Sequence, residues 1–235
     1  MEITYKMALE VATHEAIIRQ AYKDGVGVWT WSIGLTNASG HNVERYIGNP
    51  QSLQKCLDVF VWALQKYAKE VEEAFGSVKL TEAQKAAALS FHWNTGAIKT
   101  AEWVKSYKRG NIAAARKEIM NWKTPASIIP RREKERDLFF DGKWTQSPTI
   151  VEYTKLKANS TPDWSSAKKI NISKELEAAL GTSANETKWQ TSPSGAGQGS
   201  IVTEKPVQSV SDKKATNLLE VIFELLRSIF KGGQK

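Results

Sequence analysis

Apolar residues recur every three to four positions between residues 50 and 140, which is the spacing of amphipathic helices. Gly110 and Pro125 interrupt the pattern, and Thr81 followed by Gln84 has the form of a helix-capping box. The pattern therefore predicts a mainly helical region with helices over 52–75, 81–94, 98–108, 112–122 and 125–140.

The first part of the chain predicts a helix, a turn and a strand. Apolar residues lie at helical spacing from Ile3 to Tyr22, so we expect one helix there. Lys-Asp-Gly at 23–25 is a turn sequence, and residues 26–33 alternate as a strand does. We expect a small lobe with strands beside a larger helical lobe, with a cleft between them.

After Trp144 the composition changes to Ser, Thr, Pro, Asn and Lys, and SPSGAGQGS at 192–200 is typical of a flexible linker. The domain organisation expected is a folded domain over 1–144 and a flexible linker over 145–212, with one short helix near 173–180. An amphipathic helix is expected over 213–231.

The predicted C-terminal helix is apolar around most of its circumference between Leu218 and Phe230. Such a surface is usually covered, and the spacing fits either self-association or docking onto the folded domain. Contact with a membrane surface fits equally well, although the segment is too short and too acidic to span a bilayer. Both alternatives stay open.

The formal net charge of +8 favours an anionic polymer as partner. The sequence lacks zinc-ligand spacing and a basic helix with interleaved aromatics, so we expect no nucleic-acid binding. Cys56 is the one cysteine and lies on an apolar helix face, which excludes an intramolecular disulfide and fits a reducing compartment. Residues 1–15 lack the apolar core of a signal peptide.

The chemistry-bearing residues Glu15, Asp24 and Thr30 are separated by nine and six positions. Hydrolysis of a glycosidic bond needs one carboxylic acid to protonate the leaving oxygen and one carboxylate to activate water. Glu15, partly desolvated on the first helix, suits the acid, while Asp24 in a solvated turn suits the base. The Thr30 hydroxyl could hold the water. His14 and Glu15 resemble part of a zinc motif, but Ile18 replaces the second histidine, so we expect no metal or cofactor.

Three segments resemble the phage-type lysozymes, family 24 of the glycoside hydrolases. HEAIIRQAYKDGVGVWT at 14–30 is similar to the active-site signature of that family. LTEAQKAAALSFHWNTGAI at 80–98 and IPRREKERDLF at 129–139 resemble its cleft helix and its closing helix. The three motifs occur in the family's order across about residues 3 to 144, so the resemblance covers the whole predicted domain.

The resemblance implies an α+β, predominantly α-helical fold with two lobes, a small β-hairpin lobe and a helical lobe. It implies a muramidase that cuts peptidoglycan between N-acetylmuramic acid and N-acetylglucosamine. Glu15 would be the general acid, and Asp24 and Thr30 would place and activate water. The family acts with inversion, so we expect the two carboxyl groups to lie about 6.5 to 9.5 Å apart.

Other residues are expected to contact the substrate or to support the cleft. Asn94 and Trp93 are expected to contact the sugar. The sequence after Thr30 departs from the family's Ile-Gly-x-Gly-His, so Ser32 is an alternative water-holding or substrate-binding hydroxyl. Arg131, Arg132 and Glu135 are expected to form an ion-pair network that braces the cleft; these three residues are not expected to take part in the chemistry.

The function expected is that of a phage or prophage endolysin. It would be made in the host cytoplasm without a signal peptide, depend on a holin for release, and act on the cell wall in the periplasm. An enzyme carried in the virion is a variant within the same fold. The alternative is a catalytically silent, cationic wall-binding or membrane-disrupting protein that acts through its C-terminal helix.

Overall fold

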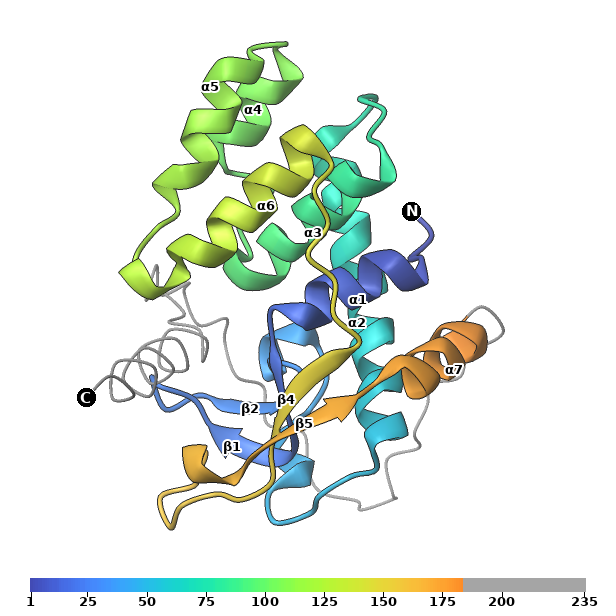
Figure 1. Ribbon diagram of the computed structural model, residues 1–235, viewed down its shortest axis with the longest axis vertical. Coiled ribbons are helices and arrows are strands. Elements are labelled where there is room, and N and C mark those ends of the chain that lie inside the picture. Colours follow the sequence, from blue (N-terminus) through green and yellow to red (C-terminus); the bar gives the residue numbers. More distant parts are fainter. Residues whose placement is uncertain (184–235) are drawn as a thin grey trace, which may run out of the picture.

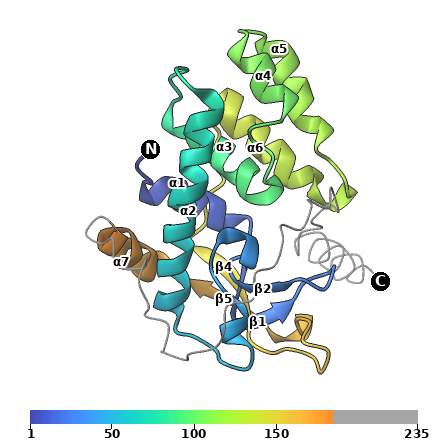
Figure 2. The same ribbon diagram turned by 180° about the vertical axis from the view of Figure 1, so that it is seen from behind.

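The computed structural model describes residues 1–183, and these residues form two lobes (Figure 1). Helices α3 to α6 gather in one lobe and a sheet of five strands forms the other, with α1 between them. The long helix α2 (Leu53–Phe75) extends from the sheet into the helical lobe (Figure 2). The expected α+β, mainly helical architecture is present.

The helical lobe is built around α3, whose residues 86–93 are all buried. Thr81 and Gln84 form the predicted capping box at its start. The lobe also contains α4 (Glu102–Lys108), α5 (Ile112–Glu118) and α6 (Ile129–Asp141), and α3 itself is Glu82–Thr95. Short 3-10 turns at Ile119–Asn121 and Ala126–Ile128 lead from α5 into α6, so the predicted helices 112–122 and 125–140 are each divided.

The small lobe contains a mixed sheet with the strand order β3-β2-β1-β4-β5. The central strand β1 pairs antiparallel with β2 and parallel with β4. Further 3-10 turns cover Asn37–Ser39, Glu44–Tyr46 and Trp164–Ser166. The strands are β1 (Ala16–Lys23), β2 (Trp29–Ser32), β3 (Leu35–Thr36), β4 (Thr149–Tyr153) and β5 (Ala167–Asn171).

The prediction of one helix from Ile3 to Tyr22 is wrong. Helix α1 (Tyr5–Thr13) ends before Glu15, and the remaining residues form β1. Ile17 on one face of β1 belongs to the main core, while Tyr22 on the other face belongs to a second apolar cluster. A strand buried on both faces has an almost continuous apolar run, so spacing alone does not distinguish it from a helix.

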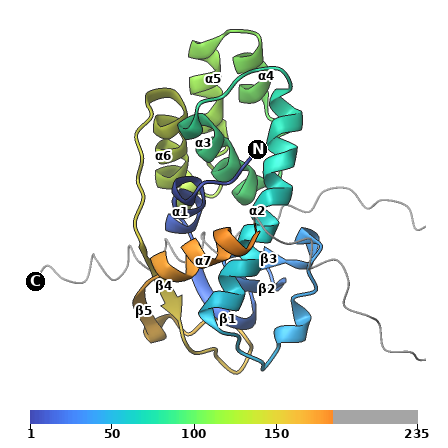
Figure 3. The ribbon, with the colours of Figure 1, turned by 90° about the vertical axis from the view of Figure 1, so that its right-hand side faces the viewer.

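The prediction of a flexible linker from residue 145 is wrong for residues 145–183. This segment adds β4 and β5 to the sheet and then forms α7 (Ser173–Ser183), which lies beside α2 (Figure 3). Ile150 and Leu176 are buried in the main core. The helix expected near 173–180 is α7, but it is docked and continues the folded domain beyond Trp144.

The remaining predicted segments, the linker over 184–212 and the helix over 213–231, lie outside the described residues. Within residues 1–183, no helix is both long enough and apolar enough to cross a membrane. Cys56 is buried on α2, in agreement with its expected place in the core.

Candidate active site

Glu15 lies in the two-residue connection between α1 and β1, and its side chain is only 5% exposed. Its Oε1 accepts a hydrogen bond of 2.7 Å from Nη1 of Arg131 on α6. Its Oε2 faces the turn between β2 and β3, where a Cβ built on Gly34 would lie 3.5 Å from it. Gly34 has a φ of +75°, so the absence of a side chain suits both the turn and the close approach to Glu15.

Behind Glu15, a buried ion-pair network connects α3 and α6. Nε of Arg131 donates to Oε1 of Glu135 at 2.8 Å, and Arg132 pairs with the other oxygen of Glu135. The Ser90 hydroxyl also donates to Glu135, at 2.7 Å. The predicted network of Arg131, Arg132 and Glu135 is confirmed, and in addition Arg131 contacts Glu15 directly.

The surroundings shift the pKa values of Glu15 and Glu135 in opposite directions. Burial raises the pKa of Glu15 above its usual value; the charge and hydrogen bond of Arg131 oppose this, and the charge of Glu135 adds to it. Burial also acts to raise the pKa of Glu135, but the charges of Arg132 and Arg131 outweigh it and hold that pKa below its usual value. Glu15 is therefore the carboxyl suited to donate a proton, and Glu135 stays a carboxylate.

Asp24 lies at the start of the β1–β2 turn and is half-buried. Its Oδ1 accepts hydrogen bonds from the backbone N–H groups of Val26 at 3.0 Å and Val28 at 2.9 Å. Desolvation raises its pKa, and the backbone N–H groups of Val28, Val26 and Gly27 oppose the rise. The turn thus fixes the carboxylate orientation through one oxygen.

The structure separates the two candidate hydroxyls. Thr30 is directly across from Tyr22 in the β1–β2 ladder, and its Oγ1 donates to Val28 O at 3.2 Å. Ser32 is completely buried and its Oγ donates to Cys56 O on α2 at 2.9 Å. The expectation of a substrate-side role for Ser32 is therefore wrong, because its hydroxyl is directed into the core.

Trp93 and Asn94 are at the end of α3 beside this cluster. Trp93 is 9% exposed, and its ring centroid lies 4.9 Å from that of Tyr67. Its Nε1 lies 3.7 Å from the Cβ position of Gly34. Asn94 is half-buried, and its Oδ1 accepts a hydrogen bond of 2.6 Å from Arg132. Glu15, Trp93 and Gly34 therefore converge on one point.

Tyr22 is a site residue that the sequence analysis did not identify. It is completely buried on β1, and burial together with the charges of Glu15 and Asp24 raises its pKa well above the usual value. The charges of both carboxylates therefore act on its hydroxyl. The position becomes informative only when residues 16–23 are recognised as a strand, because Tyr22 then precedes Asp24 by two positions.

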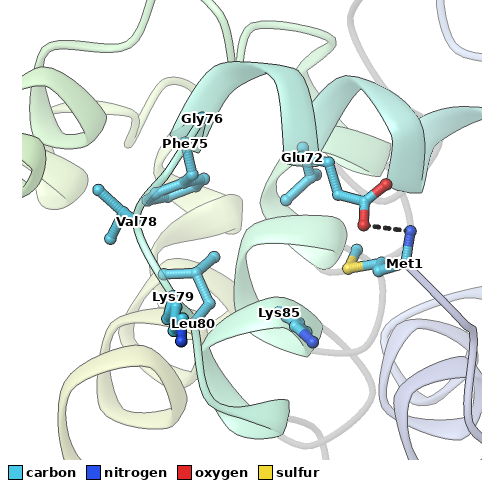
Figure 4. A pocket seen from close by; sticks show the side chains of 9 residues that line it. Met1, Glu72, Phe75, Gly76, Val78, Lys79, Leu80 and Lys85 are labelled. Atoms are coloured by element: carbon cyan, nitrogen blue, oxygen red, sulfur yellow. Dashed lines mark ion pairs between the residues drawn. The ribbon is translucent and has the colours of Figure 1, made fainter.

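A separate cavity of about 390 Å³ lies where the end of α2 meets the start of α3 (Figure 4). The Met1 ammonium pairs with Glu72 at its edge. Its other lining residues are Val71, Phe75, Gly76, Val78, Lys79, Leu80 and Lys85. None of these belongs to the cluster around Glu15. Within residues 1–183, no group of three or more His, Cys, Asp or Glu side chains could hold a metal ion.

Comparison with known proteins gives a family match. A family model described as phage lysozyme matches residues 12–135, which end before β4, β5 and α7. No curated protein matches the sequence.

Solved structures are similar to this chain. An endolysin from Escherichia coli O157:H7 phage FAHEc1 is 18% identical with a TM-score of 0.55, over 62% of this chain and 98% of that chain. A mutant of P22 lysozyme is 24% identical with a TM-score of 0.49, over 59% of this chain and 98% of that chain. The likeness to the first confirms the expected lysozyme-like fold.

Proposed function

We propose that this chain, which belongs to the phage lysozyme family, hydrolyses peptidoglycan between N-acetylmuramic acid and N-acetylglucosamine. The family match covers residues 12–135 of 235, which is more than half of the chain. Membership makes the chain a glycosidase with peptidoglycan as its substrate. The identity of the bond and the roles of the residues are the proposal.

Glu15 is the general acid in this proposal. The observation that carries the assignment is its buried carboxyl group, which has one oxygen held by Arg131 and the other directed toward Gly34 and Trp93. Burial favours the protonated form, which is the form that can donate to a leaving glycosidic oxygen. Arg131 fixes the orientation of the carboxyl group without taking the oxygen that faces Gly34.

Asp24 and Thr30 place and activate the attacking water. Backbone N–H groups fix Asp24 through Oδ1, so Oδ2 is the oxygen assigned to the water proton. Thr30 donates its hydroxyl proton to Val28 O. Its Oγ1 can therefore accept a hydrogen bond from the water. With inversion, the carboxyl groups of Glu15 and Asp24 flank the sugar and leave room for one water.

Trp93 and Asn94 supply substrate contacts beside the acid. Trp93 is the aromatic group adjacent to the Glu15 and Gly34 contact, and its indole N–H can donate to a sugar oxygen or acetamido carbonyl. Arg132 donates a hydrogen bond to Oδ1 of Asn94 and so fixes the orientation of the Asn94 side-chain amide. Arg132 therefore serves the cleft indirectly.

The test compares wild type with Glu15→Gln on purified bacterial walls stripped of outer membrane, following turbidity and released reducing ends. Gln retains a carbonyl that can accept from Arg131, so the variant should fold while losing both signals by about 10³-fold or more. Asn94→Ala should keep measurable activity with a higher KM. Clearing that survives Glu15→Gln, or that arises without reducing ends, would contradict the assignment.

We further propose that the protein is an endolysin that acts on the host wall late in infection, with holin-dependent release from the cytoplasm. The alternative of a silent wall-binding or membrane-disrupting protein assigns the effect to the predicted helix over 213–231. A chain ending at Ser183 separates the two hypotheses, because a glycosidase keeps its release of reducing ends on isolated walls. Loss of clearing in that shortened chain, with Glu15→Gln still active, would favour the alternative.

A further inference from the structure

The hydroxyl of Tyr22 has an unusual environment. The residue is completely buried, and within residues 1–183 its hydroxyl has no hydrogen-bond partner. Buried hydroxyl groups in native proteins nearly always have a hydrogen-bond partner, because leaving one unpaired costs the free energy of its desolvation. A group that the fold buries without a protein partner is a candidate for an interaction made during function.

The position of Tyr22 places this hydroxyl in the candidate active site. Tyr22 and Thr30 are cross-strand partners in the β1–β2 ladder, so their side chains leave the same face of the sheet. Asp24 comes two positions after Tyr22, directly beyond the end of β1. The charges of both Glu15 and Asp24 act on the Tyr22 hydroxyl.

Packing explains how the ring is held. Tyr22 belongs to the second apolar cluster with Ala16, Ile18 and Tyr153, and Trp164 packs against the same cluster. Tyr153 comes from β4, in the part of the chain that lies beyond the family match. The added strands therefore cover the Tyr22 ring and limit the directions that its hydroxyl can take.

We propose that the Tyr22 hydroxyl is a third group that holds the attacking water, together with Asp24 and Thr30. This inference rests on the proposed hydrolytic function. The water oxygen forms a bond to the anomeric carbon and passes one proton to Asp24, while the bond to the leaving oxygen breaks and Glu15 supplies that oxygen with a proton. Tyr22 keeps its own proton throughout and contributes a hydrogen bond and a fixed direction.

The test is Tyr22→Phe, with Tyr153→Phe as the matched control. Both changes remove one phenolic oxygen from the same apolar cluster, but burial alone raises the pKa of Tyr153, without a contribution from either carboxylate. Removing an unpaired buried hydroxyl should leave the melting temperature equal or higher. We expect Tyr22→Phe to lower kcat by about 10- to 100-fold with an unchanged KM, the range of one lost hydrogen bond to a reacting group. Tyr153→Phe should keep the wild-type kcat.

Several outcomes overturn the proposal. A wild-type kcat in Tyr22→Phe would show that the hydroxyl is idle, and a raised KM with an unchanged kcat would assign it to the sugar instead of the water. Equal losses in both variants would indicate a packing effect. Glu15→Gln, measured beside them, distinguishes failure of the proposed function from failure of the Tyr22 role. An active Glu15→Gln contradicts the proposed function itself. An inactive Glu15→Gln with a fully active Tyr22→Phe contradicts only the role of Tyr22.

Discussion

Arg131 Nη1 lies 2.7 Å from Glu15 Oε1, and both side chains are almost fully buried. An ion pair of this kind would normally lower the pKa of a carboxyl group. Here burial is the larger influence, and Arg131 shares its charge with Glu135 at 2.8 Å, so the pKa of Glu15 is raised. The arrangement keeps an acid oriented by a cation without forcing it to ionise.

This balance predicts how stability depends on pH. Because the folded state binds the Glu15 proton more tightly than the unfolded state, wild-type stability should fall as pH rises from the usual pKa of 4.5 through the raised pKa of the folded state. Glu15→Gln lacks the titrating group and should lack that decline. Urea unfolding of both proteins at a series of pH values measures the difference, which amounts to about 1.4 kcal/mol for each unit of pKa shift.

Activity should also fall as pH rises. Hydrolysis requires protonated Glu15, so kcat/KM should fall on the basic side at a pH above the usual glutamate value. If the stability of wild type relative to Glu15→Gln instead rises as pH increases toward 4.5 and stays constant above it, then Arg131 outweighs burial and Glu15 is ionised in the resting protein.

Gly34→Ala should damage activity more than stability. The φ of +75° makes any side chain costly by about 1 kcal/mol, and the new methyl group would lie 3.5 Å from Oε2 of Glu15, where the leaving oxygen must approach. We expect at least a tenfold loss of kcat/KM for wall fragments. Gly48→Ala is the control, because Gly48 has a φ of +64° and no atom within 4 Å of the added Cβ. Equal activity in the two variants would remove Gly34 from the site.

Ser32→Gly tests which hydroxyl serves the water. Ser32 has a φ of +56°, so glycine relieves backbone strain while removing the hydrogen bond to Cys56 O. These effects are each about 1 kcal/mol and opposite in sign, so the melting temperature should change little. Activity should be retained in Ser32→Gly and lost in Thr30→Ala. The reverse result would restore Ser32 as the water-holding residue.

The sequence predicted the helical lobe well because apolar residues recur at helical spacing and several of the helices begin with ordinary caps. Ser52 caps α2 and Thr81 caps α3, as polar residues ahead of apolar periodic segments should. The candidate carboxylates were found from their spacing and from the family resemblance, not from periodicity. The contact between Arg131 and Glu15 joins residues 116 positions apart, and local pattern contains no information on such a pair.

The errors have a common physical origin in the sheet. Residues 16–22 have the spacing of a helix because β1 is buried on both faces. The composition of residues 145–183 predicts a linker with one short helix because β4 and β5 are short and the segment is rich in polar residues. Their stability comes from partners distant in sequence: Ala16 pairs with Val151, and Leu176 packs into the main core. Tertiary contacts of this kind override local composition.

The docking of α7 leads to a final prediction. Leu176 is completely buried, so Leu176→Ala should lower the free energy of unfolding by about 2 to 5 kcal/mol, as expected for a cavity in a packed core. Glu177→Ala, at an exposed position of the same helix, should change it by about 0.5 kcal/mol or less. Urea midpoints of the two variants and wild type provide the measurement. If both variants match wild type, residues 173–183 do not contribute to the folded domain, and α7 is a helix within a linker, as the composition predicts.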